Sequence, residues 1–211
     1  TSTDLARSLT DEEVALTLEV TGAADYPLCL VPFRIMLGLS PEELVNFVAG
    51  VKPRSTSRCD LGRIKVVADG SIQGFTARLL WPGYQNGAPN GMWYVAPPQM
   101  AEIYERALVA GVQVHTHTNG DEATQLAIET LEAALKKHPT PDHRFTLQHC
   151  QLANPAQFRR MARLGMGVNL FANHHYYWGD EHYRYTVGPE RALRMNACRT
   201  ALDSGVPMTI H

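Results

Sequence analysis

Six short runs rich in branched and aromatic residues alternate with helical segments along this chain, and this alternation limits the possible folds more than any other feature. The runs cover residues 28–37, 61–68, 112–117, 144–149, 167–171 and 206–210. Helical spacing, with capping residues and helix-ending glycines, covers 10–24, 41–50, 98–110, 121–137, 155–164 and 189–203. Strands that alternate with helices build a parallel sheet from βα units. The sequence therefore predicts an α/β protein, with no pattern over residues 1–9.

Two architectures use a parallel sheet of this kind. An eight-unit (β/α) barrel usually needs about 250 residues, so six units in 211 residues predict one incomplete barrel domain over residues 1–211. The alternative is an open, doubly wound sheet. No strand is followed by a Gly-x-Gly-x-x-Gly or Gly-x-x-x-x-Gly-Lys-Ser/Thr phosphate loop. The partial TIM barrel is therefore the favoured fold.

Two segments lack regular spacing and are expected to be loops at the catalytic end. Residues 73–98 are rich in Gly, Pro and Asn, and a segment of that length is a candidate lid. Trp81 in this segment is a candidate substrate-binding residue, with plain loop packing as the alternative. Residues 172–188 carry His174 and His175 beside several aromatic residues. These two histidines could line a substrate pocket, or equally could cover the surface or pack in an interface.

Composition excludes several classes of partner. The net charge of −2 and the absence of a basic stripe argue against nucleic acid. The longest apolar run, 27–39, is interrupted by Pro32 and Arg34 and is too short to span a membrane. The four cysteines form no Cys-x-x-Cys pair, so neither a disulfide framework nor a thiolate zinc site is indicated. Without a signal peptide, a cytoplasmic location is expected.

Histidines end two consecutive predicted strands. His115 and His117 alternate at the end of 112–117 and share one face, and His149 ends 144–149. Neighbouring strands lie about 4.8 Å apart, so the imidazoles of His117 and His149 can reach one metal ion. The sequence therefore predicts a metal site at this edge of the sheet. The alternative is that each is an ordinary buried or rim histidine.

A lysine interrupts the apolar run 64–67, where a long cation is normally excluded. Burial disfavours the charged ammonium, so Lys65 is expected to lose its proton readily. A neutral amine can act as a base or add carbon dioxide to become a carbamate. The alternative is that the side chain reaches solvent or forms a salt bridge.

At this point the chain resembles the amidohydrolase superfamily, and within it amidohydrolase family 3, which includes N-substituted formamide deformylase-like and exoenzyme-regulatory-protein-like hydrolases. The resemblance covers residues 25–211 and rests on four motifs in the right order. These are Lys65-Val-Val-Ala-Asp69-Gly70-Ser71 with Thr76-Ala77, His117-Thr-Asn-Gly120-Asp121-Glu-Ala123, Gln148-His149-Cys-Gln151, and Gly188-Pro-Glu190-Arg191-Ala192 leading to Gly205-Val-Pro.

The resemblance implies a metal-dependent (β/α)8 barrel with a small β-sandwich. It implies that Lys65 is the strand-four lysine, often carboxylated, and that His117 and His149 are the metal ligands of strands five and six. These three residues are the catalytic and metal-binding candidates. His115 has no ligand role in the pattern and becomes a substrate-facing candidate. The implied cofactor is one or two divalent metal ions, zinc being the first choice.

Two features of the family pattern are missing. No histidine precedes residue 60, so the strand-one His-x-His is absent, and the strand-eight aspartate would lie beyond His211. We therefore expect an internal fragment that corresponds to strands three to eight, without strands one and two or the β-sandwich. Such a fragment would bind metal weakly or not at all and be inactive alone. Its exposed sheet edges predict a homo-oligomer.

The parent protein is accordingly expected to be an enzyme that hydrolyses a C–N bond, of amide or formamide type, in a small molecule by metal-activated water. The alternative is a non-catalytic barrel remnant with a binding or regulatory role. Fold alone does not identify the substrate.

Overall fold

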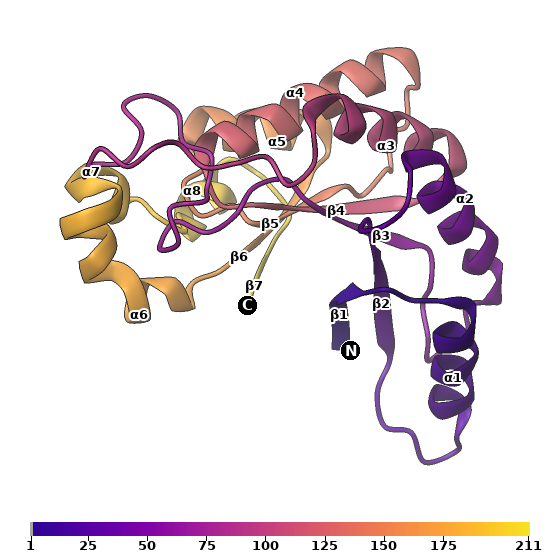
Figure 1. Cartoon of the computed structure of the whole chain (residues 1–211). Coiled ribbons are helices and arrows are strands. Elements are labelled where there is room, and N and C mark those ends of the chain that lie inside the picture. The colour runs from indigo at the N-terminus through magenta and orange to yellow at the C-terminus, as the bar shows by residue number, and fades with distance from the viewer. Residues whose placement is uncertain (1) are drawn as a thin grey trace.

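The computed structural model describes residues 2–211, which form one parallel sheet whose seven strands follow the order of the chain (Figure 1). The strands are β1 Ser2–Arg7, β2 Leu30–Ile35, β3 Arg63–Val67, β4 Gln113–Thr118, β5 Thr146–His149, β6 Gly167–Leu170 and β7 Met208–Ile210. Every neighbouring pair is parallel. Within the described residues β1 and β7 pair with one neighbour each and not with one another. The sheet is thus a curled part of a barrel, and the predicted partial (β/α) barrel is confirmed.

Helices connect successive strands, and α2 to α5 lie together along one side of the sheet (Figure 1). The longer helices are α1 Asp11–Gly22, α2 Pro41–Val51, α3 Pro97–Ala110, α4 Asp121–Lys137 and α5 Pro155–Leu164. The short elements are η1 Lys52–Arg54, α6 Asn173–Glu181, η2 His182–Thr186, α7 Gly188–Leu193 and α8 Cys198–Asp203. No helix within residues 2–211 is both long and apolar enough to cross a bilayer.

Capping residues fix where three of these helices begin: Thr10 for α1, Ser40 for α2 and Asn154 for α5. Ser40 and Asn154 each accept a hydrogen bond from the backbone N–H of the residue three positions later. The side chain of that residue in turn accepts a hydrogen bond from the backbone N–H of the cap. Proline follows each cap at the first helical position, where its missing N–H costs nothing. The boundaries of α2 and α5 are therefore encoded locally.

Side chains that alternate along each strand place the core residues on one face of the sheet and the polar residues on the other. In β4, Val114, Thr116 and Thr118 are buried against the helices, while His115 and His117 are only half-buried and lie on the other face. The main core lies between sheet and helices and is built from aliphatic and aromatic side chains. It includes Ile64, Val66, Val114, Leu147 and Val168 of the strands and Ile103, Ile128, Leu131 and Phe158 of the helices. The face away from these helices, here called the inner face, carries the polar residues.

The structure adds one strand to the six expected. Residues 1–9 show no sequence pattern, yet Ser2–Arg7 forms β1 and pairs with β2 through an irregular register between Asp4 and Arg7. An edge strand has only one neighbour to satisfy, so its sequence is weakly constrained. The other six strands lie within the predicted ranges, or within one residue of them.

The chain after β6 differs from the sequence expectation in two places. The segment expected to be a loop, 172–188, is helical, with α6 followed by the π-helical turn η2. The single helix expected over 189–203 is two short helices, α7 and α8. Between them Asn196 has a positive φ of 48°, and its backbone N–H donates to the carbonyl of Gln151. That bond holds a turn where the sequence spacing alone favours a continuous helix.

The candidate lid, 73–98, has a packed core of its own. Ala77, Leu79 and Tyr84 are buried together with Ile72 and with residues of the later chain. The Tyr84 hydroxyl donates to the carbonyl of Ala77 at 3.0 Å. The segment is therefore packed against the rest of the protein, and its role as a lid stays a prediction.

Candidate metal centre at the carboxyl end of the sheet

Two of the three residues predicted to bind metal, His117 and His149, lie at the carboxyl ends of adjacent strands, and Lys65 lies in the middle of the next strand, beside His115 in the register. Lys65 belongs to β3, His117 to β4 and His149 to β5. His117 stands beside Val67 in the β3–β4 register, and His149 stands beside Thr118 in the β4–β5 register. The ring centroids of His117 and His149 are 4.7 Å apart. The fold thus brings the two imidazoles together, as expected from their matched positions.

Lys65 is almost fully enclosed. Its exposed fraction is 5%, and burial lowers the pKa of its ammonium to about 8. No hydrogen bond or ion pair within the described residues reaches its amine. Its charge contributes to lowering the pKa of His117 and His149, and in the register it lies beside His115. The salt bridge that offered an alternative explanation is not formed within residues 2–211.

Backbone contacts fix the protonation of His117. Burial lowers the pKa of this imidazole to about 4, so the ring is neutral at pH 7. Its Nε2 lies 3.0 Å from the carbonyl oxygen of Gly70. The amide nitrogen of Asn119 lies 3.1 Å from the same Nε2, and the carbonyl, which only accepts hydrogen bonds, favours a proton on Nε2 and a lone pair on Nδ1. The Nδ1 atom is therefore the one available to a metal ion.

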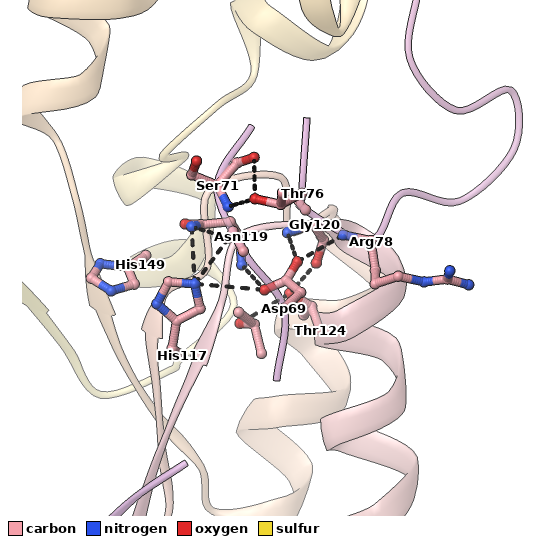
Figure 2. A network of polar contacts seen from close by, with 12 residues as sticks. Asp69, Ser71, Thr76, Arg78, His117, Asn119, Gly120, Thr124 and His149 are labelled. Atoms are coloured by element: carbon pink, nitrogen blue, oxygen red, sulfur yellow. Dashed lines mark hydrogen bonds and ion pairs between the residues drawn. The ribbon is translucent and has the colours of Figure 1, made fainter. Parts of the chain in front are cut away.

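A buried carboxylate ties the loops around His117 together (Figure 2). Asp69 is 0% exposed and accepts backbone N–H bonds from Arg78, Asn119 and Gly120 at 2.8–2.9 Å. Burial raises the pKa of its carboxyl to about 7, against the opposing effect of these three donors. Its Oδ1 is 3.7 Å from Nε2 of His117, a polar contact and not an ion pair, because the ring is neutral. Asp69 thus anchors both the β4–α4 turn and the lid segment.

His149 has a partner that sequence reasoning missed. Its Nδ1 lies 2.9 Å from Nε2 of His211, which follows β7. Burial, reinforced by the charges of His117 and Lys65, lowers the pKa of His149 to about 2. The missed signal was the run of β7 toward the same end of the sheet, since parallel strands present their carboxyl ends together.

His115 lies one pleat below His117 on the inner face. The amides of Gln113 and Gln148 contact its two ring nitrogens at 2.9 and 2.7 Å, and burial lowers its pKa to about 3. The contacts continue from Gln148 to Asn169 and from Asn169 to Thr209, each at 2.8 Å. A cavity of about 500 Å³ opens on this face beside them. His115 is thus part of an amide ladder that spans β4 to β7.

The remaining substrate-binding candidates are dispersed. His174 is near the metal candidates, since its ring lies 4.2 Å from that of Phe171 and its Nδ1 lies 2.5 Å from the amide of Gln151. His175 is engaged elsewhere, by the carbonyl of Met195. Trp81 is 94% exposed. Only His174 of these three contacts residues that adjoin His149.

The donor set fits part of a metal site. Two neutral imidazoles and a buried amine with no hydrogen bond suit a divalent ion such as zinc. No group of three or more His, Cys, Asp or Glu side chains within the described residues gathers in a metal-holding arrangement. The residues present would therefore hold one side of an ion.

Comparison with known proteins agrees with this geometry. A family model described as "Amidohydrolase family" matches residues 6–211. The "Putative amidohydrolase YtcJ" of Bacillus subtilis is 27% identical over 179 residues, which are 83% of this chain and 32% of that protein. "Protein LONG AFTER FAR-RED 3" of Arabidopsis thaliana is 26% identical over 146 residues, 69% of this chain and 25% of that protein. The chain thus spans at most about a third of these curated relatives.

Solved structures show the same fold. An uncharacterized metal-dependent hydrolase from Pyrococcus furiosus superposes with a TM-score of 0.75 at 19% sequence identity. The match covers 95% of this chain and 40% of that one.

Proposed function

Since this chain belongs to the amidohydrolase family, we propose that it supplies the Lys65, His117 and His149 side of the active site of a metal-dependent hydrolase. The substrate class we propose is a small molecule with an amide or formamide-type C–N bond. The observation that carries the proposal is the meeting of two neutral imidazoles at the ends of adjacent strands, with the buried, unpaired Lys65 on the next strand. A cytoplasmic location stays a prediction from the sequence.

Each of the three residues has a separate task in this proposal. His117 would offer Nδ1, because Gly70 holds the proton on Nε2. His149 would offer the ring nitrogen that does not face His211. Lys65 loses its proton more readily than an exposed lysine, because burial lowers its pKa to about 8, and once neutral it could bind directly or react with carbon dioxide, losing a proton to give an anionic carbamate. A bound divalent ion, zinc in our proposal, would polarise the carbonyl and bring the pKa of a water molecule toward about 7.

The 211-residue chain alone is expected to be a poor catalyst. It spans 32% of the first curated relative, and at most three of its groups meet at the site. Three ligands on one side of an ion rarely hold it firmly. Elemental analysis of the purified chain after dialysis should find substoichiometric metal. Tight, stoichiometric zinc on this chain would show that the site is more complete than we propose.

Substitution of the two histidines in the longest natural form of the protein tests the assignment. His117→Ala and His149→Ala should each lose bound metal and hydrolysis of an amide and formamide panel, because each removes a ligand. His138→Ala is the matched control, since His138 follows α4 and contacts Glu105 on the surface. Retention of both metal and rate in either site variant would refute the assignment.

The alternative function is a barrel remnant that binds a ligand or regulates a partner without catalysis. The amide ladder and the adjoining cavity of about 500 Å³ are the features that favour it, since they offer polar groups independent of any metal. The same panel separates the two readings. Hydrolysis that depends on added zinc supports the enzyme, and its absence in the metal-loaded longest form supports the remnant.

A further inference from the structure

We propose that a left-handed turn at His149 and Cys150 moves the side chain of His149 from the face of the sheet packed against the helices, here called the helix face, to the inner face, and that Cys150 is the positioning residue of this turn. The use of His149 as a metal ligand rests on the proposed function. The turn, and the face to which it directs the imidazole, do not.

The regular alternation of β5 would place His149 on the helix face. Leu147 packs in the main core between sheet and helices, and Gln148 belongs to the amide ladder of the inner face. Successive side chains of a strand point to opposite faces, so the residue after Gln148 is expected on the helix face. The register agrees, because His149 stands beside Thr118, which is buried against the helices. A regular strand end would therefore keep the imidazole away from His117.

The imidazole of His149 nevertheless lies on the inner face. Figure 2 shows its ring beside that of His117, and the two centroids are 4.7 Å apart. The backbone explains the change, since φ is 69° at His149 and 47° at Cys150, a region that residues other than glycine rarely adopt. The N–H of Cys150 donates to the carbonyl of Gln148 at 2.9 Å. This bond closes the rare, strained form of the γ-turn, which has a positive φ at its centre.

Cys150 takes the place on the helix face that His149 leaves. Its side chain is fully buried in the main core, and its Sγ lies 3.8 Å from the hydroxyl of Thr124 in α4. Its N–H donates a second bond to the carbonyl of Thr118 at 2.7 Å, which ties the turn to β4. Backbone strain persists only where the surroundings enforce it, and such strain clusters at functional sites. The buried thiol and the shared N–H are the contacts that enforce it here.

NMR of the labelled, metal-free chain tests the turn directly. We expect a strong contact between the amide and α protons within His149 and within Cys150, because a positive φ brings these two protons together. We also expect contacts between the rings of His149 and His117. A negative φ at His149, or contacts from its ring to Thr118 or Thr124, would overturn the proposal.

The strained backbone also predicts an unusual order of stability for two substitutions of His149, both of which remove the imidazole. Glycine normally destabilises a strand relative to alanine, whereas at a positive φ the order is reversed. In the metal-free chain we expect the folding equilibrium constant of His149→Gly to exceed that of His149→Ala by about 5-fold, measured by urea unfolding. At Thr146, in the same strand and without a positive φ, alanine should be favoured over glycine by about 3-fold. A preference for alanine at both positions would overturn the proposal.

Zinc titration of the longest natural form tests the positioning role of Cys150. Cys150→Ser keeps the size of the side chain and should bind zinc nearly as the wild type does. Cys150→Val is branched at Cβ, which disfavours a positive φ, and should weaken zinc binding about 10-fold. Cys59→Val is the matched control, because Cys59 is equally buried but belongs to a separate cluster. It should lower stability without changing zinc affinity.

Equal zinc affinity in the wild type and in folded Cys150→Val would refute the positioning role. An equal loss of affinity in Cys59→Val would also refute it, because general destabilisation would then explain the effect. If Cys150→Val does not fold by circular dichroism, the wild-type NMR and the two substitutions of His149 still decide whether the turn exists. Failure of the wild type to bind zinc would refute the proposed function alone, because the metal-free experiments judge the turn separately.

Discussion

At the scale of single residues, Asp69 and Gly120 explain why the Lys-x-x-x-Asp and His-x-x-Gly motifs occur together. Asp69 follows β3 and accepts from the backbone of Gly120, which precedes α4. The carbonyl of Arg78, from the lid segment, lies against the same glycine. The carboxylate of Asp69 and the absence of a side chain at Gly120 thus let the end of β3, the start of α4 and the lid segment pack together. These two residues act on the site through the loops that they hold.

Replacing Asp69 with asparagine should destabilise the chain. The amide nitrogen would face at least one of the three backbone N–H groups that the carboxylate now accepts. We expect a loss of about 1–3 kcal/mol in the free energy of unfolding, measured by urea denaturation. Asp203→Asn is the control, because Asp203 is exposed and, among the residues that the structure describes, pairs only with Arg199; it should cost less than about 1 kcal/mol. Equal losses in the two variants would contradict the anchoring role.

Gly120→Ala should disturb the lid segment through steric contact alone. The added Cβ would lie 1.7 Å from the carbonyl oxygen of Arg78, although the backbone φ of −78° suits alanine. We expect a lower melting temperature and faster proteolysis within 73–98. Gly50→Ala in α2 is the control, since its Cβ meets nothing within 4 Å. Unchanged proteolysis of Gly120→Ala would show that the contact with Arg78 can relax freely.

At the scale of elements, the sequence predicts best where local chemistry decides. Ser40-Pro41 and Asn154-Pro155 encode the starts of α2 and α5 by capping, and both starts are predicted to the residue. Periodicity fails for α6, because its aromatic residues Tyr176 and Tyr177 are exposed and give no buried stripe. It also fails between α7 and α8, where a tertiary bond from Asn196 to Gln151 sets the break.

In the candidate site, too, the local sequence predicts some features and tertiary contacts decide the others. Lys65, His117 and His149 are recognisable because a cation or imidazole interrupts or ends an apolar strand. The partnership of His149 with His211 needs the register of β5, β6 and β7, which no local pattern contains. The anchoring of three backbone N–H groups by Asp69 likewise depends on how separate loops meet.

The π-helical element η2 should make stability depend on pH. His182 is buried, its Nδ1 contacts the Thr186 hydroxyl at 2.8 Å, its Nε2 has no partner in the described residues, and burial lowers its pKa to about 4. Between about pH 6.5 and 4 the unfolded chain binds a proton that the folded chain does not, so stability falls as pH is lowered through this window.

His182→Gln isolates this contribution from the other buried histidines, which act in the same direction. The wild type should lose about 1–3 kcal/mol more than the variant between pH 7 and pH 4. Urea unfolding at a series of pH values measures the difference. Parallel pH profiles for the two proteins would show that His182 does not titrate between the folded and unfolded states.

At the scale of the whole molecule, the sheet has two free edges within the described residues, β1 and β7. Unpaired backbone groups at such edges favour association with another chain. We expect the 211-residue chain to self-associate with increasing concentration, measured by light scattering after size exclusion. Ile210→Lys, which places a charge on an exposed position of β7, should reduce association. A monomer at all concentrations would contradict edge pairing.

The order of the strands along the sheet is also their order along the chain. Each βα unit therefore docks mainly on the unit before it and the unit after it, as repeats do in a solenoid. Each strand pairs with the strand before or after it in the chain, so the chain segment closed by each pairing is shorter than it would be for strands far apart in sequence. During synthesis from the N-terminus, each βα unit can therefore fold and dock on the unit before it, which has already folded.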